Sequence, residues 1–175
     1  LLDKPAAEIL TLTHTNPIPG LFCILSDDPA KVKTEAQRSL DQNLRTHLKV
    51  KLYGNTNTDC AIIHAARAVM GAKTYLTGDA NMGYRHAQTN TPVDDIVAAM
   101  LALRAAGLDA CEDPAQMSNA QWDVVQRRVG DLALIPDEPM RPAWKAKLTM
   151  DPGMGRIYNM HPNCMGSFIE TVELG

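Results

Sequence analysis

The chain has 175 residues, of which 45% are hydrophobic and 21% are charged, a balance typical of a folded domain with a sizeable core. Its net charge is −3 and its lysines and arginines form no cluster, which argues against a nucleic-acid interface and against an anionic membrane surface as partners. The sequence contains no apolar run long enough to predict a membrane span, and its first residues do not resemble a signal peptide.

Helix start and stop signals divide the chain after residue 20 into strands that alternate with helices. In chain order, the pattern predicts strands at 21–25, 46–53, 72–77, 108–111, 131–135 and 156–160, with helices at 29–45, 59–70, 92–106 and 118–129 between them. Such alternation predicts right-handed βαβ units and a parallel sheet. An open doubly wound sheet or a barrel would fit, although no glycine-rich phosphate loop follows the first strand, which disfavours a dinucleotide-binding fold.

The spacing of the cysteines bears on the redox compartment in which the protein resides. Cys23, Cys60, Cys111 and Cys164 are widely spaced and form no C-x-x-C pair of the kind that binds zinc or carries redox chemistry. We therefore expect reduced thiols in the core of a cytoplasmic protein.

Two lysines stand on one face of the expected strand at 46–53. Lys49 and Lys51 alternate with apolar residues, so both ammonium groups point the same way. On a solvated edge strand this would carry no function. In a strand packed on both faces, each ammonium group would lower the pKa of the other, and a lysine with a lowered pKa can act as a general base near neutral pH.

The next expected strands end in residues that could bind a metal or transfer protons. Asp79, Glu112 and Asp137 follow three consecutive strands, and His161 follows the last one. A single acid at a strand end is commonly a helix cap, but three in consecutive βα units predict a shared site at the carboxyl edge. Oxygen ligands alone suit Mg²⁺ first and Mn²⁺ second. His161 is equally compatible with a structural and a catalytic role.

Four motifs in this order resemble the enolase superfamily, and within it the muconate-lactonizing and mandelate-racemase-like enzymes. They are Lys-Val-Lys at 49–51, Asp-Ala-Asn-Met-Gly-Tyr at 79–84, Glu-Asp-Pro at 112–114 and Asp-Glu at 137–138. The resemblance implies an α/β fold of the (β/α) TIM-like barrel type, here an incomplete barrel of about six βα units over 21–175. Residues 1–20 would then be a lead-in segment from the end of a capping domain. Because such a barrel needs about 250 residues, we expect polypeptide outside this chain to complete it.

The resemblance also implies a cofactor and a site. Mg²⁺, with Mn²⁺ as the alternative, would bind to Asp79, Glu112 and Asp137. The substrate would be a small carboxylate, whose α-proton the enzyme removes through a metal-stabilised enediolate. We also expect a homo-oligomer.

The remaining roles follow from the same resemblance. Lys51 would be the base, Lys49 would tune it and touch the substrate, and Asn81 would help to bind the substrate. The family commonly has lysine or aspartate where this chain has His161, which can still exchange a proton near neutral pH. A racemase or epimerase is the leading hypothesis. An acid-sugar dehydratase or lactonizing lyase, and a non-catalytic relative, remain alternatives.

Overall fold

Five short strands form one parallel sheet in the computed structural model, which describes residues 3–9, 11, 20–85, 91–150 and 154–174. The strands are β1 (Phe22–Ile24), β2 (His47–Lys51), β3 (Tyr75–Asp79), β4 (Ala110–Glu112) and β5 (Ala133–Ile135). Their spatial order is the order along the chain, without the reversal of a doubly wound sheet. The predicted α/β fold with a barrel-like wall is therefore confirmed. Part of the expected lead-in segment, 12–19, lies outside the described residues.

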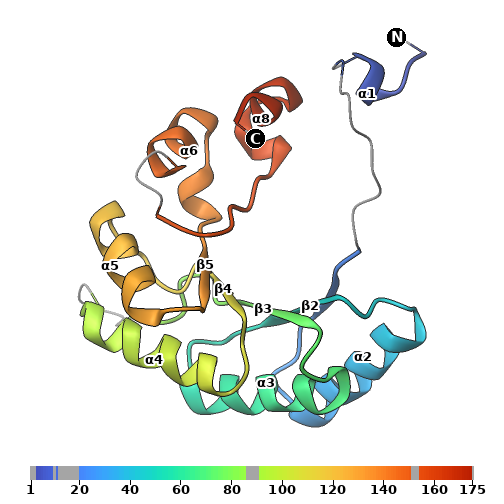
Figure 1. The fold of residues 1–175 in the computed structure, drawn as a ribbon, viewed down its shortest axis with the longest axis vertical. Coiled ribbons are helices and arrows are strands. Elements are labelled where there is room, and N and C mark those ends of the chain that lie inside the picture. Colours follow the sequence, from blue (N-terminus) through green and yellow to red (C-terminus); the bar gives the residue numbers. More distant parts are fainter. Residues whose placement is uncertain (1–2, 10, 12–19, 86–90, 151–153, 175) are drawn as a thin grey trace.

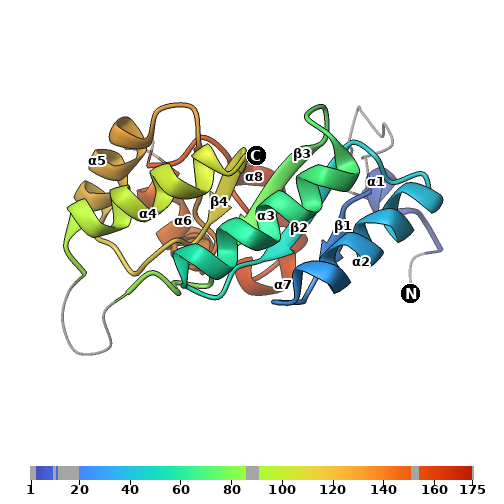
Figure 2. The ribbon, with the colours of Figure 1, turned by 90° about the horizontal axis from the view of Figure 1, so that it is seen from below.

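Four helices connect the strands and cover one face of the sheet. They are α2 (Pro29–Asp41), α3 (Thr56–Met70), α4 (Val93–Ala105) and α5 (Asn119–Val129). Figure 2 shows them side by side, and each packs on the next. The short α1 (Ala6–Ile9) precedes the sheet, while η1 (Glu138–Met140), α6 (Ala143–Met150), α7 (Pro162–Met165) and α8 (Phe168–Leu174) follow it (Figure 1). Among the described residues, no helix has the length and apolar character needed to cross a membrane.

Side-chain caps set where the connecting helices begin. Asp28 accepts the backbone N–H of Ala30 at 2.9 Å, as expected for a cap of α2. Ser118 forms a capping box at the start of α5. Helix α3 begins three residues before the predicted start, because Asn55 caps it by accepting the N–H of Thr58. Helix α2 ends at Asp41 rather than near residue 45.

The two faces of the sheet differ in character. Leu48 and Val50 of β2 are fully buried and join the core under the helices, as the alternation predicted. Lys49 and Lys51 lie on the opposite face, which carries the candidate site. All four cysteines are free thiols, but only Cys111 is buried, and Cys23 is exposed. The expectation that all four lie in the core is therefore wrong.

The sixth strand predicted at 156–160 does not form. The Arg156 N–H donates to the carbonyl of Leu134 and the Asn159 N–H donates to that of Pro136, each at 3.2 Å. A parallel ladder advances by two residues on both strands, but here the donors are three residues apart and the acceptors two. The segment therefore follows β5 without continuing the sheet, and the prediction of six strands is wrong by one.

The turns after β2 and β3 touch through two glycines, which allows a stability prediction. Gly54 has φ +75°, and an added Cβ would lie 2.3 Å from the Gly83 carbonyl oxygen, whereas Gly71 has φ +76° and would meet nothing within 4 Å. Gly71→Ala should cost about 1–3 kcal/mol of unfolding free energy through backbone strain. Gly54→Ala should cost about 1–3 kcal/mol more, because of the clash. Urea unfolding of both variants measures the difference, and equal losses would contradict the contact.

Candidate functional site

A row of charged side chains crosses the sheet at its carboxyl edge. Lys51, Asp79 and Glu112 are direct partners in the register of β2, β3 and β4, so their side chains leave the same face of the sheet. Lys49 lies two residues before Lys51 and shares that face. The strands thus bring together both predicted lysines and two of the three predicted metal ligands.

The lysines contact these acids directly. Lys49 Nζ lies 2.5 Å from Glu112 Oε2 and 3.7 Å from Asp79 Oδ2. Lys51 Nζ lies 3.7 Å from Asp79 Oδ1. The side chain of Glu112 is only 5% exposed, so its ion pair with Lys49 is screened little by solvent.

The surroundings of Lys49 favour the protonated form of its side chain. Burial lowers the pKa of Lys49, but its hydrogen bond to Glu112 and the charges of Glu112 and Asp79 outweigh burial, and the net pKa is raised. The expectation that the two lysines lower each other's pKa is therefore wrong for Lys49. The physical reason is that two carboxylates lie against its ammonium group.

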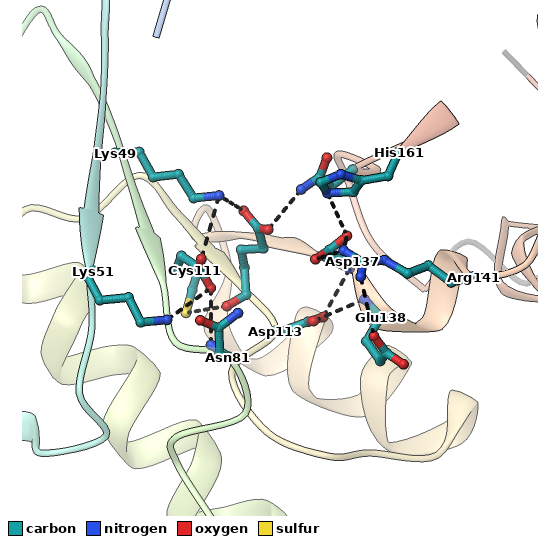
Figure 3. A network of polar contacts seen from close by, with 12 residues as sticks. Lys49, Lys51, Asn81, Cys111, Asp113, Asp137, Glu138, Arg141 and His161 are labelled. Carbon is teal, nitrogen blue, oxygen red and sulfur yellow. Dashed lines mark hydrogen bonds and ion pairs between the residues drawn. The ribbon is translucent and has the colours of Figure 1, made fainter. Parts of the chain in front are cut away.

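Asp137 belongs to a second group of charges. It lies two residues beyond the end of β5, and both its carboxylate oxygens accept from Arg141 Nη2, at 2.7 and 2.6 Å. His161 Nε2 lies 3.1 Å from Asp137 Oδ1. Figure 3 shows Lys49 and Lys51 entering from β2 on one side, while His161 and Arg141 enter from the C-terminal part on the other.

Asp113 fixes the chain at the start of this second group. It is buried, and its carboxylate accepts the backbone N–H groups of Asp137 and Glu138, each at 3.0 Å. Burial raises the pKa of Asp113, against the opposing effect of these two hydrogen bonds. Asp113 thereby ties the turn after β4 to the turn after β5.

Asn81 lies at the edge of the site. Its backbone N–H donates to Asp79 Oδ1 at 3.1 Å, and its φ of +41° turns the chain away from β3. The side chain is exposed beside the acids (Figure 3). Its role in substrate binding remains a prediction.

Three residues of the site were not anticipated. Asn159 Nδ2 donates to Glu112 Oε1 at 2.8 Å, and Cys23 of β1 is the register partner of Lys49. Alternation could have found Cys23, which lies in the middle of the first predicted strand, but not Asn159, because residues 156–160 form no strand. No sequence signal marks Arg141, since a 3₁₀ helix brings it back to Asp137.

The three predicted ligands suit Mg²⁺ by chemistry, because all are carboxylates at the ends of consecutive strands. Within the described ranges, however, no three acidic, histidine or cysteine side chains gather closely enough to hold an ion. Lys49 lies against Asp79 and Glu112, and Arg141 lies against Asp137. Bound Mg²⁺ would have to replace part of this positive charge, so the ligand set remains a prediction.

Comparison with known protein families decides the ancestry of the chain. The family model described as "Enolase C-terminal domain-like" matches residues 31–174. The chain belongs to this family. The predicted membership of the enolase superfamily is therefore confirmed. A search of curated proteins found no significant match.

Solved structures of this superfamily share the fold. A racemase from Streptomyces coelicolor A3(2) with bound magnesium is 20% identical, with a TM-score of 0.78, over 95% of this chain and 48% of its own. A muconate cycloisomerase from Pseudomonas fluorescens is 20% identical, with a TM-score of 0.76, over 96% and 46%. An enolase from Bradyrhizobium complexed with magnesium and mandelic acid is 19% identical, with a TM-score of 0.73, over 89% and 41%. The chain thus spans less than half the length of these proteins.

Proposed function

We propose that this protein is a Mg²⁺-dependent enzyme, with Mn²⁺ as an alternative ion, that removes the proton α to the carboxylate of a small substrate. We further propose that it returns the proton as a racemase or epimerase. The observation that carries this proposal is the placement of Lys51 and His161 on opposite sides of the acids (Figure 3). The magnesium and mandelic acid bound by superfamily structures support it.

The carboxylates of Asp79, Glu112 and Asp137 would hold the ion. When bound, Mg²⁺ supplies a fixed positive charge that favours loss of the weakly acidic α-proton. Asp113 keeps Asp137 in place through the backbone, and Asn159 orients the Glu112 carboxylate. These contacts hold two of the three proposed ligands in position.

Lys51 is suited to move the proton on one face of the substrate. Its Nζ is buried and makes no hydrogen bond within the described part of the chain, apart from its 3.7 Å ion pair with Asp79. Once the Lys51 ammonium group has lost its proton, the free amine could therefore accept the α-proton without first breaking a hydrogen bond. Lys49 is held by Glu112, so it would contribute charge near the substrate carboxylate rather than act as a base.

His161 is suited to serve the opposite face. Its Nε2 is buried and lies 3.1 Å from Asp137 Oδ1, without a hydrogen bond among the described residues. A racemase needs one group that takes the proton and another that returns one from the other side, and Lys51 and His161 supply this pair. A dehydratase or lactonizing lyase is the second candidate, favoured by the contact with Asp137, which would also suit His161 as a general acid.

A groove of about 650 Å³ opens beside Lys49 and Glu112, and its other walls are Leu21, His47, Tyr75, Thr77, Ile135, Ile157, Tyr158 and Asn159. Neither Lys51 nor His161 lines this groove, and side chains of a complete barrel would fill it, so it does not define where the substrate binds. We also propose that residues 21–175 form the barrel part of the protein and that residues 1–20 lead in from a capping domain.

The proposal is tested by proton NMR in D₂O, with Mg²⁺ and a panel of 2-hydroxy acids, acid sugars, amino acids and dipeptides. We expect one class to lose its α-proton signal. Glu112→Gln should then weaken Mn²⁺ binding by more than the 10- to 100-fold that loss of an outer-shell partner typically costs. Glu35→Gln, at an acid of α2 that forms a surface ion pair with Arg38, is the matched control. No exchange with any acid, or unchanged Mn²⁺ affinity in Glu112→Gln, would contradict the proposal.

A further inference from the structure

Asp59 is a charged residue that is completely buried away from the site. It lies in the first turn of α3, with an exposed fraction of 0%. Its Oδ1 accepts the backbone N–H of Tyr53 at 2.8 Å, and its Oδ2 accepts the N–H of Gly54 at 3.0 Å. The hydroxyl of Tyr84 donates to the same Oδ2. Asp59 is therefore paired on both oxygens, as a buried carboxylate must be.

These partners belong to the turns that follow the strands of the proposed site. Tyr53 and Gly54 stand two and three residues after Lys51, the last residue of β2, and Tyr84 closes the turn that begins after Asp79 at the end of β3. The Tyr84 backbone N–H also donates to the carbonyl of Pro114 at 3.0 Å, in the turn after β4. The Asp59 carboxylate thus links the turns after β2 and β3, and the Tyr84 backbone adds the turn after β4.

The link leaves little freedom between the turns after β2 and β3. Leu52 donates its N–H to the carbonyl of Asp79 at 2.9 Å, and the backbones of Gly54 and Gly83 are in contact. Burial, followed by the hydrogen bond to Asp59, raises the pKa of Tyr84 well above its usual range, so the hydroxyl remains a donor at physiological pH. A rearrangement that separates these turns would leave the buried carboxylate of Asp59 without hydrogen-bond partners.

We propose that Asp59 and Tyr84 are positioning residues that hold Lys51 against Asp79 in the geometry that proton transfer requires. The inference rests on the proposed function, since it concerns the same lysine and the same metal ligand. A misplacement of about 1 Å at a reacting group can cost about 10²-fold in rate. Neither Asp59 nor Tyr84 needs to touch the substrate for this effect.

The test compares Tyr84→Phe and Asp59→Asn with the wild-type protein. Hydrogen exchange of the Tyr53 and Gly54 amides should accelerate about 10-fold in Tyr84→Phe, and by more in Asp59→Asn, which weakens a charged acceptor. With the acid that the wild-type protein exchanges, kcat should fall by about 10-fold and about 10²-fold respectively, while KM changes little. A merely structural role would not produce this split between kcat and KM.

Two controls separate positioning from general loss of stability. Tyr53→Phe removes a hydroxyl from an exposed tyrosine in the same turn, without touching the backbone donor. Ser39→Ala removes a buried hydrogen bond of 2.7 Å to the carbonyl of Leu44, at the other end of β2. Both should keep wild-type amide exchange at Tyr53 and Gly54 and wild-type kcat.

Each outcome decides the inference. Wild-type amide exchange in Tyr84→Phe and Asp59→Asn would overturn it, and so would faster amide exchange with kcat unchanged, because the link would then be structural only. If the wild-type protein exchanges no α-proton with any acid, the proposed function fails instead. The amide exchange rates would still decide whether Asp59 and Tyr84 hold the two turns.

Discussion

Replacing Lys51 with alanine should reduce α-proton exchange by about 10²–10⁴-fold, the range that a general base contributes. The ammonium group is buried, forms no hydrogen bond in the described part of the chain, and stands beside Asp79 at the edge of the proposed metal site. Because the lysine is not a ligand, Mn²⁺ affinity should change far less than exchange. Single-turnover exchange in D₂O and Mn²⁺ titration measure the two quantities.

A matched lysine variant is the control for this experiment. Lys33→Ala removes an exposed lysine from α2, remote from the sheet edge, and should leave both exchange and Mn²⁺ affinity at wild-type values. If Lys51→Ala keeps more than about a tenth of the wild-type exchange rate, Lys51 is not the base. If Mn²⁺ affinity falls as far as exchange does, its charge acts in binding rather than in proton transfer.

The fold was predictable because the alternation of apolar residues and the helix caps indicated the same order of strands and helices. Strict alternation placed Leu48 and Val50 in the core, and Lys49 on the opposite face, as the structure has them. Caps at Asp28 and Ser118 marked helix starts from the sequence alone. The prediction failed at 156–160, where Ile157, Tyr158 and Met160 make a short segment that resembles a strand. Whether such a segment joins a sheet depends on its register with β5, which local sequence does not specify.

The relative placement of the candidate residues was most predictable on the regular strands. Register brings Lys51, Asp79 and Glu112 into one row, and period-2 spacing adds Lys49. Arg141 reaches Asp137 through an irregular turn and a 3₁₀ helix, so neither spacing nor alternation indicates it. The raised pKa of Lys49 likewise depends on how close Glu112 comes, which is a matter of side-chain geometry.

Replacing His161 with asparagine should distinguish the two proposed reactions. His161 enters the site from the side opposite Lys51, and its Nε2 lies 3.1 Å from Asp137 Oδ1 (Figure 3). In a racemase that uses two bases, each base serves one face of the substrate. The variant should then lose exchange from one enantiomer by about 10²–10⁴-fold and keep exchange from the other.

A lyase would respond differently to the same change. If His161 is the general acid for a leaving group, exchange catalysed by Lys51 should persist, while product formation falls by about 10²–10⁴-fold. His64→Asn, at an exposed position on α3, is the matched control and should change neither quantity. Parallel assays of exchange from each enantiomer and of product formation give the answer. Wild-type values in both for His161→Asn would make His161 a structural residue and leave Lys51 as the only base, a result that favours lyase chemistry.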